Sequence, residues 1–123
     1  MDGTTTDGRL ALGRAGEDAA LAVFERRGYA LVARNWRHPL GELDLVLLRR
    51  GTLVVCEVKT RTGAAFGGGY EAVTRSKRRT LRRLAEAFLQ QQGVGVEQVR
   101  FDVASVWMPP GGHADVEVFE DAF

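Results

Sequence analysis

A glutamate and a lysine, Glu57 and Lys59, stand one residue apart at the end of an apolar run that begins at Leu53. In a β-strand they emerge on the same face, because successive side chains point to opposite faces. A buried strand carries such charges at a cost unless they are paired or coordinated. Asp44, in the leucine-rich segment 41–48, supplies a second carboxylate. Two carboxylates beside a lysine indicate a site for a divalent cation with oxygen ligands.

The turn between the two segments predicts which of these residues face each other. Residues 49–52 have the pattern of a tight hairpin, whose second loop residue is a glycine that tolerates positive φ. Counting outward from this turn places Asp44 directly opposite Glu57. The same count places Glu42 opposite Lys59. Facing carboxylates lie about 5 Å apart at Cβ and repel each other, which favours a cation between them.

An ordinary surface hairpin is the alternative. In such a hairpin Glu42 and Lys59 form a cross-strand salt bridge, and the other two acids are merely solvated. This alternative explains Asp44 and Glu57 poorly, because the residues around them are nearly all apolar. We therefore prefer the metal-site interpretation for Asp44, Glu57 and Lys59, and both interpretations stay open for Glu42.

Basic residues gather in the first half of a helix predicted for residues 74–92, which Gly93 would end. Cations there oppose the helix dipole, so their placement favours a role other than stability. We expect them to neutralise DNA phosphates, and a solvated helix face is the alternative. Lys77, on the side of the apolar stripe, is predicted to reach toward the carboxylates. The basic residues are Arg75, Lys77, Arg78, Arg79, Arg82 and Arg83, and the stripe is Leu81, Leu84, Ala85 and Phe88.

Two further charged residues, Glu17 and Arg61, are candidates for the same site. Glu17 lies on the core-facing stripe of an earlier helix, predicted for residues 13–27, and needs a partner there. An acid near a helix N-terminus, stabilised by the dipole, is the alternative to a role in the site. Arg61 adds positive charge at the end of the Glu57 strand. The glycine-rich segment 60–70 that follows either closes over a nucleic acid or is a mobile connector.

A longer series of motifs is more specific than the carboxylates alone. It comprises Gly16-Glu17, Arg34-Asn35-Trp36-Arg37, Gly41-Glu42-Leu43-Asp44-Leu45-Val46, Glu57-Val58-Lys59-Thr60-Arg61 and Arg100-Phe101-Asp102-Val103. In order and spacing the series resembles the YraN-like family of small bacterial proteins, over residues 12–107. That family is usually described as uncharacterised or as candidate endonucleases, and it is similar to the archaeal Holliday junction resolvases.

The resemblance implies a restriction-endonuclease-like fold and a metal site. By that resemblance Asp44, Glu57 and the carbonyl of Val58 would bind Mg²⁺ or Mn²⁺. The cation would lower the pKa of a water molecule and stabilise the charge developing on the phosphate. Lys59 would orient that water or neutralise the developing charge. Glu17 would complete the metal site or hold one of its waters, so the implied catalytic residues are Asp44, Glu57, Lys59 and Glu17.

Length and composition agree with one α/β domain. A chain of 123 residues with 45% apolar content can form a single core. We expect this domain over residues 10–123, after a flexible N-terminus at residues 1–9. Its predicted order is helix, three strands, helix and two strands around a mixed sheet. The lone Cys56 excludes a disulfide framework, and no segment resembles a signal peptide or membrane span, which favours the cytoplasm.

Two classes of function are consistent with these features. The first is a magnesium-dependent endonuclease that hydrolyses phosphodiester bonds of DNA, with branched DNA as one candidate substrate. The second is a nucleic-acid-binding or partner-binding module that keeps a nuclease-like fold without turnover. A net charge of +1 does not separate them, since only the local clustering of charge indicates DNA. Both classes allow a homodimer.

Overall fold

The structure, a computed structural model, describes residues 4–62, 73–93 and 95–123. These residues form one five-stranded mixed sheet in the order β1-β2-β3-β4-β5, in which β3 and β4 run parallel and all other neighbours antiparallel. The predicted α/β class and the predicted element order are confirmed. The elements are α1 (Thr4–Arg26), β1 (Ala30–His38), β2 (Gly41–Arg49), β3 (Thr52–Arg61), α2 (Arg75–Gln92), β4 (Gln98–Trp107) and β5 (Asp115–Phe119).

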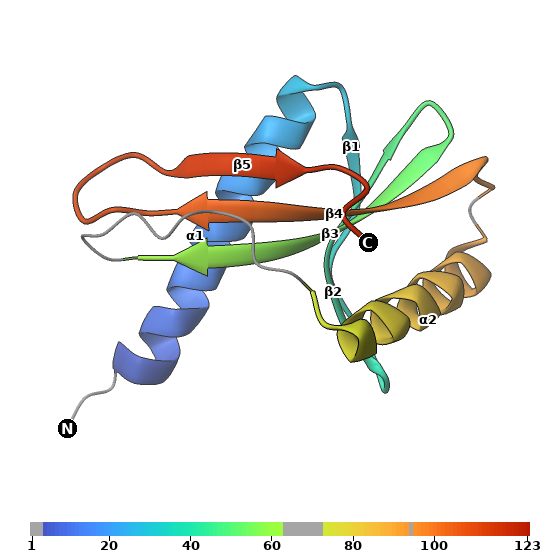
Figure 1. Cartoon of the computed structure of the whole chain (residues 1–123), viewed down its shortest axis with the longest axis horizontal. Coiled ribbons are helices and arrows are strands. Elements are labelled where there is room, and N and C mark those ends of the chain that lie inside the picture. Colours follow the sequence, from blue (N-terminus) through green and yellow to red (C-terminus); the bar gives the residue numbers. More distant parts are fainter. Residues whose placement is uncertain (1–3, 63–72, 94) are drawn as a thin grey trace.

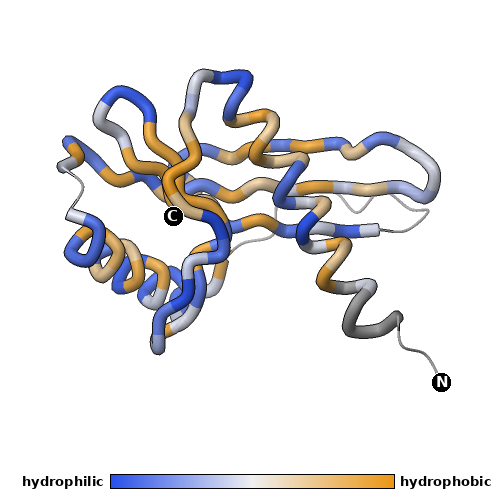
Figure 2. The backbone as a smooth tube through the Cα atoms, turned by 180° about the vertical axis from the view of Figure 1, so that it is seen from behind, coloured by the Kyte–Doolittle hydropathy of each residue, from blue (hydrophilic) through white to orange (hydrophobic). Residues whose placement is uncertain are grey.

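The two helices lie on opposite faces of the sheet, so the core has two layers (Figure 1). Apolar residues fill the central strands, and the turns at the strand ends are hydrophilic (Figure 2). The α1-side core consists of Ala20, Phe24, Tyr29, Leu45, Leu47, Val54, Cys56, Ala104 and Val106. The α2-side core consists of Leu43, Val46, Leu53, Val55, Val73, Leu81, Leu84, Ala85, Phe88 and Val103. Cys56 is thus a core residue, as predicted.

Helix α2 forms as its sequence predicts. The side chain of Thr74 caps its start by accepting a hydrogen bond from the backbone N–H of Lys77 at 3.1 Å. Gly93 ends the helix in the left-handed conformation, with φ of 67°, and its N–H donates to the carbonyl of Leu89. The whole predicted apolar stripe of α2 is buried. The stripe therefore fixes which face of α2 meets the sheet.

The hairpin between β2 and β3 has the predicted register. Arg49 pairs with Thr52, and the ladder continues to the pair Leu45–Cys56. Both loop residues have positive φ, 48° at Arg50 and 79° at the following glycine, as a two-residue hairpin turn of this hand requires. The count from the turn is therefore confirmed as far as Leu45, and the facing pairs Asp44–Glu57 and Glu42–Lys59 counted beyond it are wrong, because the ladder ends before them.

Helix α1 is longer than predicted, because it begins at Thr4 rather than near Gly13. It approaches β3 so closely that a Cβ atom placed on Gly16 would collide with the hydroxyl of Thr60.

The flexibility expected of residues 1–9 stays a prediction, and the segment 63–72 of the glycine-rich loop lies outside the described residues. Among the described residues, no helix combines the length and the apolar content that a membrane crossing needs.

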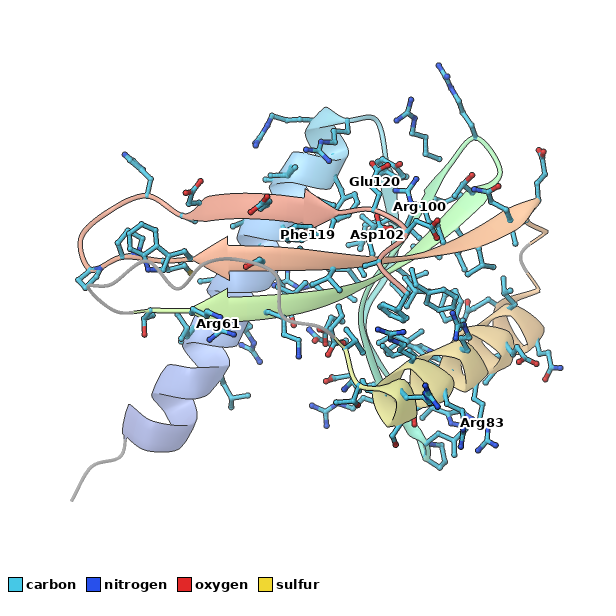
Figure 3. The ribbon with its side chains drawn as sticks, viewed as in Figure 1. Arg61, Arg83, Arg100, Asp102, Phe119 and Glu120 are labelled. Carbon is cyan, nitrogen blue, oxygen red and sulfur yellow. The ribbon has the colours of Figure 1, made fainter. Side chains whose placement is uncertain are left out.

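A buried carboxylate fastens the segment after β5 to β4. Asp102 is fully buried and accepts two hydrogen bonds from the guanidinium of Arg100, each 2.9 Å long. It also accepts one from the backbone N–H of Asp121 at 3.0 Å. Figure 3 shows Arg100, Asp102 and Glu120 converging at this place, where Arg100 also lies 3.6 Å from Glu120. The charge of Asp102 is therefore satisfied within the fold, and we assign it a structural role.

Candidate active site

The candidate site lies where β2 and β3 diverge. Their ladder ends at Leu45–Cys56, and β3 then continues away from the β1–β2 hairpin (Figure 1). One residue beyond that last pair, Oδ2 of Asp44 accepts a hydrogen bond from the backbone N–H of Val58 at 2.9 Å. A side chain of β2 thus replaces the backbone carbonyl that would satisfy this N–H in a continuing ladder. The divergence leaves room for side chains between the two strands.

In β1 and in β2, the regular alternation of side chains between the two faces of the sheet is interrupted. The two interruptions lie opposite each other. Leu43 belongs to the α2-side core and Leu45 to the α1-side core, although side chains two residues apart normally share a face. Asn35 lies opposite Asp44, between the pairs Arg34–Leu45 and Trp36–Leu43. It has a φ of 53°, a value uncommon outside glycine, which asparagine tolerates better than most residues. Strained backbone of this kind is often found at functional sites.

Asp44 is held in surroundings that disfavour its charge. Burial, followed by the negative charge of Glu57, raises the pKa of Asp44 to about 7, and the hydrogen bond from Val58 only partly opposes this rise. Glu17 and Glu42 contribute further negative charge. Asp44 and Glu57 are therefore close enough for their charges to interact, although they are not paired in the ladder. A bound cation would favour the ionised form of Asp44.

Two lysines from different elements flank Glu57. Nζ of Lys59, on the same strand, lies 3.9 Å from Oε2 of Glu57, and Nζ of Lys77, on α2, lies 3.5 Å from the same oxygen. Only 10% of the Glu57 side chain is exposed, so these two ammonium groups compensate a carboxylate that is largely removed from water. The prediction that Lys77 reaches toward the carboxylates is confirmed.

Glu17 is held by β1. Its Oε1 accepts hydrogen bonds from Nε of Arg34 at 3.2 Å and from Nδ2 of Asn35 at 3.0 Å. Because α1 begins at Thr4, Glu17 does not lie at a helix N-terminus, and stabilisation by the dipole there is excluded as its explanation. Arg34 and Asn35 belong to the motif at residues 34–37. The sequence of this strand gave no sign that their side chains would bind Glu17.

Glu42 pairs with β1 rather than with β3. Its Oε2 lies 3.5 Å from Nε of Arg37, so the cross-strand salt bridge with Lys59 considered for an ordinary hairpin is wrong. Glu42 also borders a pocket of about 250 Å³ between α1 and the β1–β2 hairpin. The pocket is lined by Leu10, Gly13, Arg14, Glu17, Asn35, Arg37 and Glu42. Glu42 therefore belongs to the rim of the site.

The arginines of α2 form a separate surface, which we call the arginine pocket. It has a volume of about 470 Å³, and five of its six lining residues are arginines. Figure 3 shows Arg83 on this surface and Arg61 at the distant end of β3. Arg61 is thus not brought together with the α2 cluster. The arginine pocket is lined by Arg75, Arg78, Arg79, Arg82, Arg83 and Glu86, without Lys77.

Comparison with known proteins identifies the family. The model of the uncharacterised protein family UPF0102 matches residues 16–106. The chain belongs to the UPF0102 family. A UPF0102 protein of Clavibacter michiganensis subsp. michiganensis is 48% identical over 111 residues, which cover 90% of this chain and 94% of that protein. Similar proteins of Frankia alni and Moorella thermoacetica are 47% and 42% identical and cover 92% and 94% of this chain. The predicted YraN-like resemblance is confirmed.

The donor set of this UPF0102 member suits a cation that completes its coordination with water and substrate. Within residues 4–62, 73–93 and 95–123, no three His, Cys, Asp or Glu side chains are grouped as a metal site. Two carboxylates, Asp44 and Glu57, do converge. Mg²⁺ is commonly bound by one or two carboxylates together with waters and substrate phosphates, so a pair is enough. The chemistry of the site therefore fits Mg²⁺ better than an ion that needs a full set of protein ligands.

Proposed function

We propose that this protein is a divalent-metal-dependent DNA endonuclease whose site is built on Asp44 and Glu57. One observation carries the proposal, the convergence of these two carboxylates beside Lys59 where β2 and β3 diverge. A purely structural hairpin gains nothing from this arrangement, because burial and the charge of Glu57 disfavour the ionised form of Asp44. A cation between the carboxylates would remove that penalty.

In this proposal Asp44, Glu57 and the carbonyl of Val58 hold Mg²⁺ or Mn²⁺. When bound there, the ion would supply Lewis-acid stabilisation of phosphate charge and a more acidic water. Lys59, fixed on β3 at 3.9 Å from Glu57, adds positive charge where the phosphate becomes more negative. Glu17 adds negative charge at Asp44 and, through Asn35, ties α1 to the strand that faces Asp44.

The proposed substrate is DNA, with branched DNA as the first candidate because of the resemblance to Holliday junction resolvases. The arginine pocket supports a polyanionic substrate, since five guanidinium groups surround one hollow on α2. Arginine binds phosphate through its planar fork of donors, and each contact releases counterions from the nucleic acid. Lys77 places the same helix next to Glu57. A DNA backbone on α2 would therefore lead toward the carboxylates.

A cleavage panel tests the proposal. Linear, nicked, flapped and four-way DNA are incubated with wild type or Asp44→Asn in Mg²⁺, in Mn²⁺ or in EDTA. We expect the wild type to cleave at least one substrate in a metal-dependent way and Asp44→Asn to be inactive although folded. Calorimetric titration with Mn²⁺ should show weaker binding by the variant. Equal Mn²⁺ binding by both proteins would overturn the shared cation, and cleavage of no substrate would favour a binding module.

A further inference from the structure

The basic residues of α2 fall into two groups, one that lines the arginine pocket and one that lies beside the carboxylates. Five arginines line the arginine pocket. Lys77 does not line it, and its ammonium lies 3.5 Å from Oε2 of Glu57 instead. The helical period anticipates this division, because Lys77 lies four residues before Leu81, on the side of the apolar stripe. The division suggests a role for Lys77 that the arginines do not share.

Lys77 is less constrained to stay beside Glu57 than Lys59 is. Lys59 is on β3, two residues from Glu57 on the same face, so the sheet keeps the two together. Lys77 comes from another element, and 48% of its side chain is exposed, against 33% for Lys59. Its ammonium stands on a flexible four-carbon stem. The backbone of Lys77 is fixed by the Thr74 cap, so the ammonium can move without any movement of α2.

We propose that Lys77 changes partners when a divalent cation binds: it pairs with Glu57 in the cation-free protein and with a DNA phosphate in the cation-bound protein. The inference rests on the proposed function. A cation coordinated by Glu57 repels the ammonium, because two positive charges then compete for one carboxylate. The released ammonium lies beside the arginine pocket, on the side nearer the carboxylates. It is there available to the phosphate closest to the reaction.

Such an exchange couples the two binding events. A cation that frees Lys77 increases the affinity for DNA, and DNA that binds Lys77 increases the affinity for the cation by the same factor. The protein would then bind its substrate tightly only when it is loaded with metal. An ordinary phosphate contact, such as one made by Arg79, contributes to DNA affinity to the same extent with and without the cation. The two kinds of residue are thus distinguishable by experiment.

The test compares Lys77→Met, Lys77→Arg and the arginine-pocket control Arg79→Gln with the wild type. Calorimetry measures Ca²⁺ affinity without DNA, and fluorescence anisotropy measures the affinity for a labelled four-way junction in EDTA and in Ca²⁺. Lys77→Met should bind Ca²⁺ several-fold more tightly and should bind DNA in EDTA as the wild type does. In Ca²⁺ it should lose about tenfold in DNA affinity, within the usual range of coupling factors. Lys77→Arg should retain the coupling.

Arg79→Gln should lose DNA affinity by a similar factor in EDTA and in Ca²⁺, without a change in Ca²⁺ affinity. The same pattern in Lys77→Met would overturn the exchange and would leave the proposed nuclease activity standing. Absence of Ca²⁺ binding by the wild type would overturn the shared cation, and the exchange with it. Coupling in a wild type that cleaves no DNA would support the exchange and overturn the nuclease.

Discussion

The backbone N–H of Val58 donates a 2.9 Å hydrogen bond to Oδ2 of Asp44 at a level where the β2–β3 ladder has already ended. This bond favours the ionised carboxylate, whereas burial and the charge of Glu57 disfavour it. Burial and the charge of Glu57 outweigh the hydrogen bond, since the pKa of Asp44 is raised to about 7. Asp44 is therefore held in place by β3 and, at the same time, is only partly ionised near pH 7 in the absence of a cation.

Asp44→Asn should stabilise the cation-free protein, and more so as the pH rises from 4 to 7. The pKa of Asp44 is about 7 in the folded protein against 3.8 without the fold, so the folded state binds the proton more tightly. Stability from this group is complete below pH 4 and is lost as the pH rises through about 7. The loss is at most about 4 kcal/mol, because one pKa unit corresponds to about 1.4 kcal/mol. Urea unfolding in EDTA from pH 4 to pH 8 measures it, and a difference independent of pH would contradict it.

Lys59→Met should reduce turnover far more than DNA affinity. We expect Lys59 to act mainly on charge that develops in the transition state, so its loss reduces the cleavage rate without a comparable effect on binding. Removing an oxyanion-stabilising donor typically reduces the rate by about 10²–10³-fold. Single-turnover cleavage at saturating protein gives the rate, and equilibrium binding in Ca²⁺ serves as the control. A wild-type cleavage rate in the variant would remove Lys59 from the mechanism.

Replacing Arg79 and Arg83 by Gln should weaken DNA binding and reduce its dependence on salt. Each lost phosphate contact should reduce the log–log salt slope by about 0.9 for duplex DNA. The matched control replaces Arg26 and Arg27, which are equally exposed at the end of α1 and lie outside the arginine pocket. Both proteins lose the same net charge, so general electrostatic attraction falls equally. Identical slopes for the two double variants would show that α2 does not contact the DNA backbone.

Gly16→Ala should destabilise the protein by about 1–3 kcal/mol, the usual effect of overpacking. The new methyl group would collide with Thr60 on β3 and push α1 from the sheet. Thr60→Ala should partly restore stability, since it removes the colliding hydroxyl. Gly13→Ala is the control in the same helix. Its methyl group meets nothing within 4 Å, so it should stabilise the helix by roughly 0.5–1 kcal/mol. Thermal unfolding that ranks the two variants equally would contradict the close contact.

The elements that depend on local pattern could be predicted from the sequence. The two-residue turn at Arg50 determined the register of β2 against β3, because a hairpin aligns its strands from the loop outward. The apolar period of α2 and its glycine cap determined which face is buried and where the helix ends. That register predicted that Asp44 and Glu57 would be close to each other, although the ladder itself ends before them. It required no knowledge of how the helices pack.

The features that the sequence did not predict arise from contacts between elements. The register counted from the turn in the sequence can be extended past Leu45 without a break. It therefore gave no sign that β2 and β3 diverge there. The interruption at Asn35 coincides with a contact to α1, because the asparagine amide donates a hydrogen bond to Glu17. The helical period predicted that Lys77 reaches toward the carboxylates, but the particular atom that it meets, Oε2 of Glu57, depends on where α2 docks. Each of these is a tertiary relationship between residues far apart in the chain.

The parallel pairing of β3 with β4 has a consequence for the order of folding. Strands β1 to β3 are joined by short turns, whereas Thr52 pairs with Gln98 only after all of α2 has been traversed. Pairing between distant segments is slow, since a long loop must close before its contacts stabilise the chain. We therefore expect Asp44 and Glu57 to meet early, in the β1–β3 meander, before Lys77 arrives with α2. Charge repulsion between the two acids would then slow the first folding step, and a divalent cation in the refolding buffer would accelerate it.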